Sequence, residues 1–254
     1  MDYKKLFHKE EAFQRETFQK RMEEFGFKNM ARMELFLWDL ELFLHIQKIL
    51  GDKIILKGGA ATQFYLPRDA QRTSVDIDML FFGTEEEIKE TLRKIEEYLG
   101  TEDELFYFHK HSPKNPKTNL PLHTYYMKVP SALSNAERNM DRESIPYQEL
   151  KIEFILQPEK WEYERRTGEN IFAVNSSWNY QILPLNYLFA DKLTTLGCNT
   201  IGVQNERLDE QVKQFYDIMM LSRNCISEMQ CSVVERKVFK TGRTRWNTRK
   251  ITRG

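Results

Sequence analysis

Short apolar runs alternate with longer stretches of helical periodicity along most of the chain. Residues 31–50 (ARMELFLWDLELFLHIQKIL) repeat apolar side chains at helical spacing, and Gly51 ends this stretch. KIILKGG, residues 53–59, predicts a buried strand, a tight turn and the start of a helix. The apolar stripe expected on the first helix comprises Leu35, Trp38, Leu42, Ile46 and Ile49.

A second strand is predicted for VDIDMLFF, residues 75–82, which Gly83 closes. TEEEIKETLRKIEEYLG follows and predicts a helix that Thr84 caps and Gly100 ends, with acidic side chains in its first turn. The pattern of residues 158–177 is mixed and predicts no definite element. Further strands are expected at 104–110 (ELFYFHK), 122–129 (LHTYYMKV) and 148–156 (QELKIEFIL).

The last third of the chain has a helical pattern. LPLNYLFADKLTTLG, residues 183–197, has Pro184 near its start and Gly197 at its end, the asymmetry typical of a helix. ERLDEQVKQFYDIMMLSR, residues 206–223, predicts a second helix. The residues expected to face the core are Leu185, Leu188, Phe189, Leu193 and Leu196 in the first helix, and Val212, Phe215, Tyr216 and Met219 in the second.

These elements predict an α/β (α+β) fold in which helices flank a mixed β-sheet, with a helical portion at the C-terminal end. The expected divisions are a charged helical segment at 1–29, an α/β domain at 30–177, a helical domain at 178–236, and a basic, flexible tail at 237–254. The sequence leaves open whether the first segment packs on the body or forms an arm.

Composition narrows the class of protein. Apolar residues make up 41% of the 254 residues, which excludes a disordered chain. The counts of Lys+Arg and Asp+Glu are both 38, which argues against broad non-specific binding to nucleic acid but allows a local basic patch. The three cysteines form no CxxC pair, so neither a disulfide framework nor a zinc site is expected. We expect a cytoplasmic protein, because the charged start and the lack of a long apolar run predict neither a signal peptide nor a membrane span.

Two aspartates stand in one of the most apolar stretches of the chain. Side chains alternate along a strand, so Asp76 and Asp78 share a face and lie about 7 Å apart. Like charges in a core repel each other and are costly to desolvate. A divalent cation between them removes that cost, and Mg²⁺ or Mn²⁺ suits such oxygen ligands.

A third carboxylate and a glycine turn complete the candidate site. Glu153 is the acidic residue inside the apolar run LKIEFIL, and it would converge with the aspartates if the two strands are neighbours. Three carboxylates that hold two metal ions are the usual means of phosphoryl or nucleotidyl transfer. Gly58 and Gly59 follow a strand and open a helix, where backbone N–H groups can approach a phosphate.

These residues carry a resemblance to a known family. LKGGAATQFYL followed by RTSVDIDML resembles the first motif of the nucleotidyltransferase superfamily, and is most similar to AbiEii-type toxins of bacterial toxin–antitoxin and phage-defence systems. The wider superfamily usually has Gly-Ser at the turn, whereas Gly59 takes the place of that serine here. The spacing from Gly59 to Asp76 is also a few residues longer than usual, with the extra length at residues 67–71.

The later half of the chain supports the same resemblance, which covers about residues 54–222. Ala190-Asp191-Lys192-Leu193 and the pair Tyr216-Asp217 match family segments in two successive helices. The family often has an aspartate three residues before the second of these aspartates, where this chain has Gln214. The sequence therefore leaves open whether Asp217 or Asp209 carries the acidic role of this helix.

The resemblance implies residue roles. Asp76, Asp78 and Glu153 would bind Mg²⁺ or Mn²⁺, and Lys192 would reach the nucleotide phosphates. The catalytic set implied is Asp76, Asp78, Glu153, Lys192 and Asp217; the nucleotide-binding set is Lys57, Gly58, Gly59, Arg72, Ser74 and Lys192. The nucleotide would be a nucleoside triphosphate, with GTP and the pyrimidine nucleotides as candidates.

The function expected from this resemblance is transfer of a nucleoside monophosphate to an acceptor. The acceptor would be RNA, such as a tRNA end, or a protein, and the enzyme would be a toxin held in check by a cognate antitoxin. Two alternatives remain: a nucleotidyltransferase for small molecules of the aminoglycoside type, and a catalytically silent fold used for binding. The sequence does not determine the oligomeric state.

Other conspicuous residues have a simpler interpretation. His109 and His111 form an HxH pattern without a third ligand, so surface histidines are expected. WEYERR, residues 161–166, mixes aromatic and basic side chains in a way that suits RNA contact, although a packed loop is the favoured interpretation. The basic tail is expected to be a frayed terminus.

Overall fold

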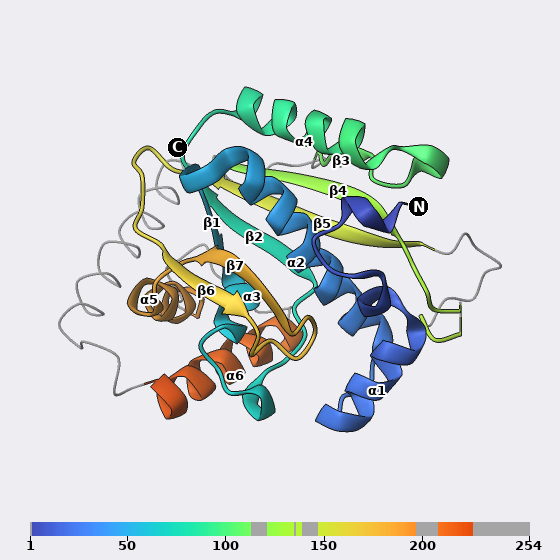
Figure 1. The fold of residues 1–254 in the computed structure, drawn as a ribbon. Coiled ribbons are helices and arrows are strands. Elements are labelled where there is room, and N and C mark those ends of the chain that lie inside the picture. Colours follow the sequence, from blue (N-terminus) through green and yellow to red (C-terminus); the bar gives the residue numbers. More distant parts are fainter. Residues whose placement is uncertain (1, 113–120, 135, 139–146, 197–207, 226–254) are drawn as a thin grey trace.

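A mixed seven-stranded sheet organises the described part of the chain in the computed structural model, which covers residues 2–112, 121–134, 136–138, 147–196 and 208–225 (Figure 1). The strands are β1 (Ile54–Lys57), β2 (Asp76–Phe81), β3 (Phe108–Lys110), β4 (Leu122–Pro130), β5 (Tyr147–Leu156), β6 (Glu164–Gly168) and β7 (Ser176–Ile182). Their order in the sheet is β3-β4-β5-β2-β1-β7-β6. The helices are α1 (Arg15–Phe25), α2 (Met30–Leu50), α3 (Gly58–Gln63), α4 (Glu85–Leu99), α5 (Leu185–Thr195) and α6 (Leu208–Cys225).

Strand β2 lies at the centre of the sheet. It pairs antiparallel with β1 and parallel with β5, so the two strands that carry the predicted carboxylates are direct neighbours. One face of β2 is apolar and fully buried through Ile77, Met79 and Phe81, while Asp76 and Asp78 point to the other face. Helix α2 contacts β1, β2 and β5 and covers the middle of the sheet. This arrangement confirms the predicted mixed α/β fold.

Most predicted strands are present, but two regions differ. The strand expected at 104–110 is restricted to β3, because Glu104 and Phe106 have positive φ angles that interrupt extended backbone. The mixed region before residue 178 contains β6, and β7 pairs in parallel with β1. The domain division expected at 178 therefore falls inside a strand of the central sheet, and the helical portion begins after it, at α5.

Helix α2 is buried on nearly all sides instead of along one stripe. Residues 36–46 are all buried, whereas Leu35 is half-buried and Ile49 is 39% exposed, so the predicted stripe was wrong at its two ends. The reason is that the N-terminal segment packs on the side of α2 that the sheet leaves uncovered. Phe18 in α1 is fully buried there, and the ring of Phe13 lies 4.5 Å from that of Trp38.

A buried carboxylate fixes the N-terminal segment to α2. Glu41 accepts hydrogen bonds from the backbone N–H groups of Phe7 and His8, and its Oε2 lies 2.6 Å from Nδ1 of His8. His45 contacts the other oxygen at 3.0 Å. Burial alone would raise the pKa of Glu41, but the hydrogen bonds from His45 and His8 prevail and lower the pKa to about 2. The segment 2–29 is thus part of the folded body and not an arm.

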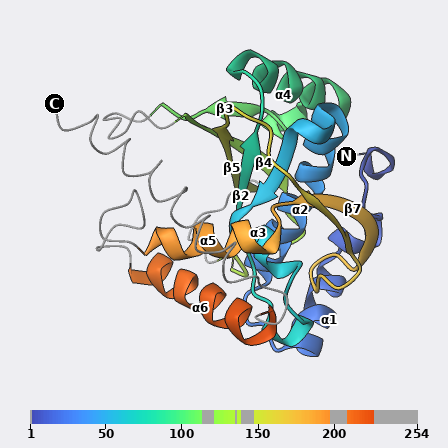
Figure 2. The same cartoon turned by 90° about the vertical axis from the view of Figure 1, so that its left-hand side faces the viewer.

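Helices α5 and α6 lie side by side next to α3 (Figure 2). The prediction that Val212, Phe215 and Met219 face the core was wrong, because these side chains are 65%, 59% and 40% exposed. The buried face of α6 instead carries Asp217 and Leu221, both with no exposed surface. A polar contact described below, and not apolar spacing, sets the rotation of this helix. Gly197 and the tail 237–254 lie outside the described residues.

Candidate functional site

Three carboxylates share one face at the centre of the sheet. In the register of β2 and β5, Asp78 lies beside Glu153 and Asp76 lies beside Lys151. Asp78 is also level with Lys57 on β1. Asp76, Asp78 and Glu153 are each half-buried as whole residues. The strand pairing therefore brings together the three residues expected to converge.

The proximity of these charges is visible in the pKa of Asp78. Desolvation by the surrounding protein raises this pKa to about 7, and the neighbouring charge of Glu153 adds to the increase. Lys57 opposes the shift, while Asp76 adds to it. Glu153 is partly neutralised, because its Oε1 lies 2.7 Å from Nζ of Lys151 and 3.4 Å from Oγ1 of Thr124. A cation close to Asp78 would relieve the repulsion that remains.

The two glycines are needed because other groups approach them closely. Gly58 has a φ of +69°, and a Cβ atom there would lie 2.1 Å from Oδ2 of Asp78. A Cβ atom on Gly59 would lie 2.8 Å from Oγ of Ser74 and 2.9 Å from Nη2 of Arg72. The glycine turn is therefore in direct contact with the aspartate strand and with the residues that precede it.

A buried aspartate holds two cations beside this turn. Asp217, which has no exposed surface, accepts hydrogen bonds from Nε and Nη2 of Arg72, both at 2.7 Å. Nζ of Lys192 lies 2.7 Å from the same carboxylate and 3.0 Å from Oε1 of Gln214. We call Arg72, Lys192 and Asp217 the basic clasp. It connects the segment before β2 to both C-terminal helices, and explains why α6 turns Asp217 inward.

Lys57 has a separate partner. Its Nζ lies 3.0 Å from Oδ2 of Asp191, the residue next to Lys192 in α5. The side chain of Lys57 is 9% exposed and that of Lys192 is 3% exposed, so both cations are largely desolvated. The structure thus gathers the predicted site residues around β2 and α3. The side chain of Asp209 lies outside the described part of α6.

Sequence reasoning missed a fourth carboxylate near the site. Asp39 of α2 is 1% exposed, and neither of its carboxylate oxygens has a hydrogen-bond partner. Burial raises its pKa well above the ordinary value, and the charges of Asp76 and Asp78 add to the increase. The signal was present in the sequence, because Asp39 interrupts the apolar run FLWDLELFL as Asp76 interrupts its own strand. Lys151 and Thr124, which contact Glu153, gave no comparable signal.

The remaining candidates lie away from the carboxylates. His109 and His111 are both exposed, as expected of surface histidines. In the segment 161–166, Trp161 is half-buried and packs at 5.1 Å from the ring of Tyr187 on α5. Arg166 lies over the ring of Tyr65 at 4.1 Å. This segment is therefore at least partly packed against the body.

A comparison with protein families identifies the chain. The model of the family described as "Nucleotidyl transferase AbiEii toxin, Type IV TA system" matches residues 42–252, which is most of the sequence. The chain belongs to the AbiEii nucleotidyltransferase toxin family. The match includes the glycine turn, the aspartate strand, Glu153 and both C-terminal helices, so these AbiEii residues have the sequence context expected of a nucleotidyltransferase.

Solved structures with a similar fold are distant in sequence. JHP933 from Helicobacter pylori is 11% identical, with a TM-score of 0.45 over 97% of this chain and 95% of that chain. An antigenic nucleotidyltransferase-like protein from Paracoccidioides brasiliensis is 12% identical, with a TM-score of 0.45 over 86% and 92%. A nucleotidyltransferase described for H. pylori is 14% identical, with a TM-score of 0.41 over 87% and 97%.

All three TM-scores are below 0.5, so the family assignment stands on the family match alone. No curated protein matches the sequence. Within the described ranges, no helix combines the length and the apolar character that crossing a membrane requires.

The basic clasp generates a stability prediction. Asp217→Asn removes the fully buried negative charge that Arg72 and Lys192 share, which we expect to lower the free energy of unfolding by about 3 kcal/mol or more. Asp52→Asn is the matched control, because Asp52 pairs with Lys160 at an exposed site and should change stability far less than Asp217→Asn does. Urea unfolding at pH 7 measures both variants. If both substitutions lowered the free energy of unfolding equally, the stabilising role of the basic clasp would be refuted.

Asp39 generates a prediction about pH. Its carboxyl group ionises above pH 3.8 in the unfolded chain but resists ionisation when folded, so it lowers stability as the pH rises. Asp39→Leu should therefore raise the free energy of unfolding by about 1–3 kcal/mol at pH 8, and by less at pH 4. Urea unfolding at the two pH values tests this, with Asp39→Asn as the isosteric variant that also removes the ionisation. If both variants gained the same free energy of unfolding at pH 4 and pH 8, the prediction would be contradicted.

Proposed function

We propose that this protein transfers a nucleoside monophosphate from a nucleoside triphosphate to a hydroxyl group of an acceptor. The observation that carries the proposal is the register of β2 and β5, which sets Asp78 beside Glu153 on a face shared with Asp76. A central strand keeps adjacent like charges only at a cost, and that cost is offset if the carboxylates bind cations during turnover. Membership of the AbiEii family supports the same chemistry.

The donor groups at this face fit a divalent cation such as Mg²⁺ or Mn²⁺. All three candidate ligands are carboxylates, and hard divalent cations prefer oxygen. Among the described residues, no set of three or more His, Cys, Asp and Glu side chains is already arranged as a metal site. Glu153 lies close enough to Asp78 to raise its pKa, and its Oε1 is paired with Nζ of Lys151 at 2.7 Å. Metal binding would therefore exchange Lys151 for the metal as the partner of Glu153.

Asp76, Asp78 and Glu153 would hold such metal ions, which supply charge neutralisation at the phosphates when bound. Glu153 would also accept the proton of the attacking hydroxyl group. The oxygen of that hydroxyl forms a bond to the α-phosphorus, the bond to the β-phosphate breaks, and pyrophosphate leaves. Arg72 and Lys192 would interact with the departing negative charge.

The acceptor and the partner belong to this proposal. We infer that the acceptor is RNA, such as a tRNA end, or a protein, and that a cognate antitoxin restrains the activity. The support is the family, which is described as the toxin of a Type IV toxin–antitoxin system. The nucleotide is a nucleoside triphosphate, with GTP and pyrimidine nucleotides as the first candidates to test.

Substitution of the aspartates tests the reaction directly. Asp76→Ala and Asp78→Ala should each reduce transfer by about a hundredfold or more, because each removes a metal ligand from the proposed site. The assay incubates the protein with Mg²⁺, bacterial RNA and each α-³²P-labelled nucleoside triphosphate in turn, and follows label in RNA and in protein. Glu149→Ala is the matched control, since this exposed glutamate lies on the same strand as Glu153 but four residues earlier, and it should retain activity.

Retained transfer in either aspartate variant would refute the carboxylate mechanism. Label in the RNA fraction and label on protein distinguish the two acceptor classes.

A further inference from the structure

Lys151 of β5 lies among the carboxylates of the candidate site. In the register of β2 and β5 it lies beside Asp76, and its Nζ lies 2.7 Å from Oε1 of Glu153. Residues two apart in a strand share a face, so Lys151 points to the same side of the sheet as Glu153. A cation of the chain itself therefore already contacts the third proposed metal ligand and lies level with the first.

Lys57 also lies beside these carboxylates, level with Asp78, but it is held differently. Its Nζ pairs with Asp191 of α5 at 3.0 Å, and its side chain is 9% exposed. The side chain of Lys151 is 36% exposed, and its ion pair is made with the proposed metal ligand Glu153 itself. A partly exposed lysine can turn into solvent without leaving an unfilled space in the core. Lys151 is therefore the cation of this face whose position can change.

The ion pair and a bound metal compete for Glu153. An oxygen that faces an ammonium group at 2.7 Å cannot also ligate a divalent cation without bringing two positive charges close together, where they repel each other. The competition ends if an anion takes the lysine. Lysine is a common ligand of phosphate groups, and the metal ions of such a site bridge the carboxylates and the phosphates of the substrate. A bound triphosphate would therefore lie over the face to which Lys151 points.

We infer that Lys151 couples the binding of the nucleotide to the binding of the metal. Without nucleotide, its ammonium group neutralises Glu153 and opposes a divalent cation. A triphosphate that draws this ammonium group towards its phosphates leaves Glu153 available to the cation. The inference rests on the proposed function and adds an order of binding to it. Lys151 acts on the metal through Glu153, so it is a positioning residue.

The test compares the Kd of Mn²⁺ with and without nucleotide, from the electron paramagnetic resonance signal of the free ion. The nucleotides are the α,β-methylene analogues of each ribonucleoside triphosphate, which cannot react at the α-phosphorus, and the Mn²⁺ that each binds by itself is subtracted. In the unmodified protein we expect nucleotide to tighten Mn²⁺ binding by about tenfold or more, a typical coupling between two ligands. Lys151→Met should bind Mn²⁺ more tightly without nucleotide by a similar factor, and the effect of nucleotide should shrink accordingly.

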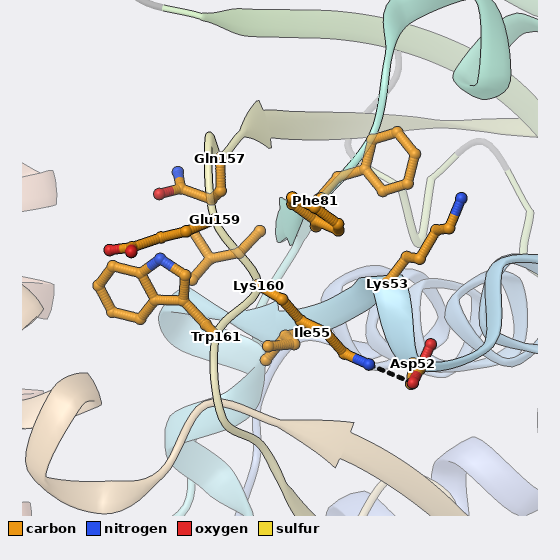
Figure 3. Close-up of a pocket in the computed structure, with 10 residues that line it drawn as sticks. Asp52, Lys53, Ile55, Phe81, Gln157, Glu159, Lys160 and Trp161 are labelled. Carbon is orange, nitrogen blue, oxygen red and sulfur yellow. Dashed lines mark hydrogen bonds and ion pairs between the residues drawn. The ribbon is translucent and has the colours of Figure 1, made fainter.

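Three further variants separate this coupling from other effects. Lys151→Arg keeps a positive charge beside Glu153 and should retain the weak metal binding, whereas Lys151→Gln should behave as Lys151→Met does. Lys160→Met is the matched control, because Lys160 also pairs with a carboxylate, that of Asp52, in the segment after β5, and should leave both constants unchanged. Thermal melting identifies any variant that fails to fold. Figure 3 shows the control pair beside a pocket whose lining includes Ile55, Leu80, Gln157 and Trp161.

Equal affinity for Mn²⁺ in the unmodified protein and in Lys151→Met, both without nucleotide, would overturn the inference. Tighter binding by Lys151→Met with an unchanged effect of nucleotide would also overturn it, since Lys151 would then act only as a nearby charge. The proposed function fails in a different way, if the unmodified protein transfers no α-³²P label to RNA or to protein. Label transfer that persists without the coupling would refute the inference alone.

Discussion

The structure depends on holding like charges at the centre of a sheet. Strand β2 presents a fully apolar face to the core and two aspartates on the other face, with Glu153 alongside on β5. A strand cannot turn one side chain away without moving the rest, since alternation fixes the face of every residue. The surrounding elements therefore have to accommodate the charges where the backbone places them. They do so by supplying cations from neighbouring segments and glycines where bulk cannot be tolerated.

The positive charges that compensate these carboxylates come from several segments of the chain. Lys57 lies on the neighbouring strand, and Lys151 is two residues from Glu153. Arg72 and Lys192 converge on Asp217, so the last helix of the described chain is tied to the segment before β2. The C-terminal helices therefore cannot shift without unpairing the buried carboxylate of Asp217 from these cations. The same clasp keeps two cations close to the glycine turn, where a nucleotide phosphate would lie.

The sequence predicted the elements that depend on local pattern and failed where tertiary contacts decide. Apolar runs located β1, β2, β4 and β5, and glycines and caps located the ends of α2 and α4. The predicted rotation of α6 was wrong. Its apolar spacing suggested one buried face, whereas the ion pairs of Asp217 bury another. β6 and β7 were missed because polar and aromatic residues mixed in that region obscure strand alternation. Pairing between distant strands leaves little trace in local periodicity.

Some residues of the candidate site could likewise be predicted from the sequence, and others could not. Asp76, Asp78 and Glu153 stand out as charges inside apolar runs, and the structure places them together. Asp39 carries the same signal on a helix, where an acidic residue is easily taken for part of a solvated face. The pocket lined by Ile55, Leu80, Gln157 and Trp161 has no signature in sequence, since its residues come from β1, β2, the residues that flank these two strands, and the segment after β5.

The central claim is that the carboxylate face binds a divalent cation. The most direct measurement is a titration of the protein with Mn²⁺, in which electron paramagnetic resonance follows the signal of the free ion, with and without a nucleoside triphosphate. We expect the protein to deplete the free-ion signal, more tightly when nucleotide is present, and Asp78→Asn to abolish this depletion. Equal binding by the unmodified protein and the variant, or no binding by either, would contradict the account.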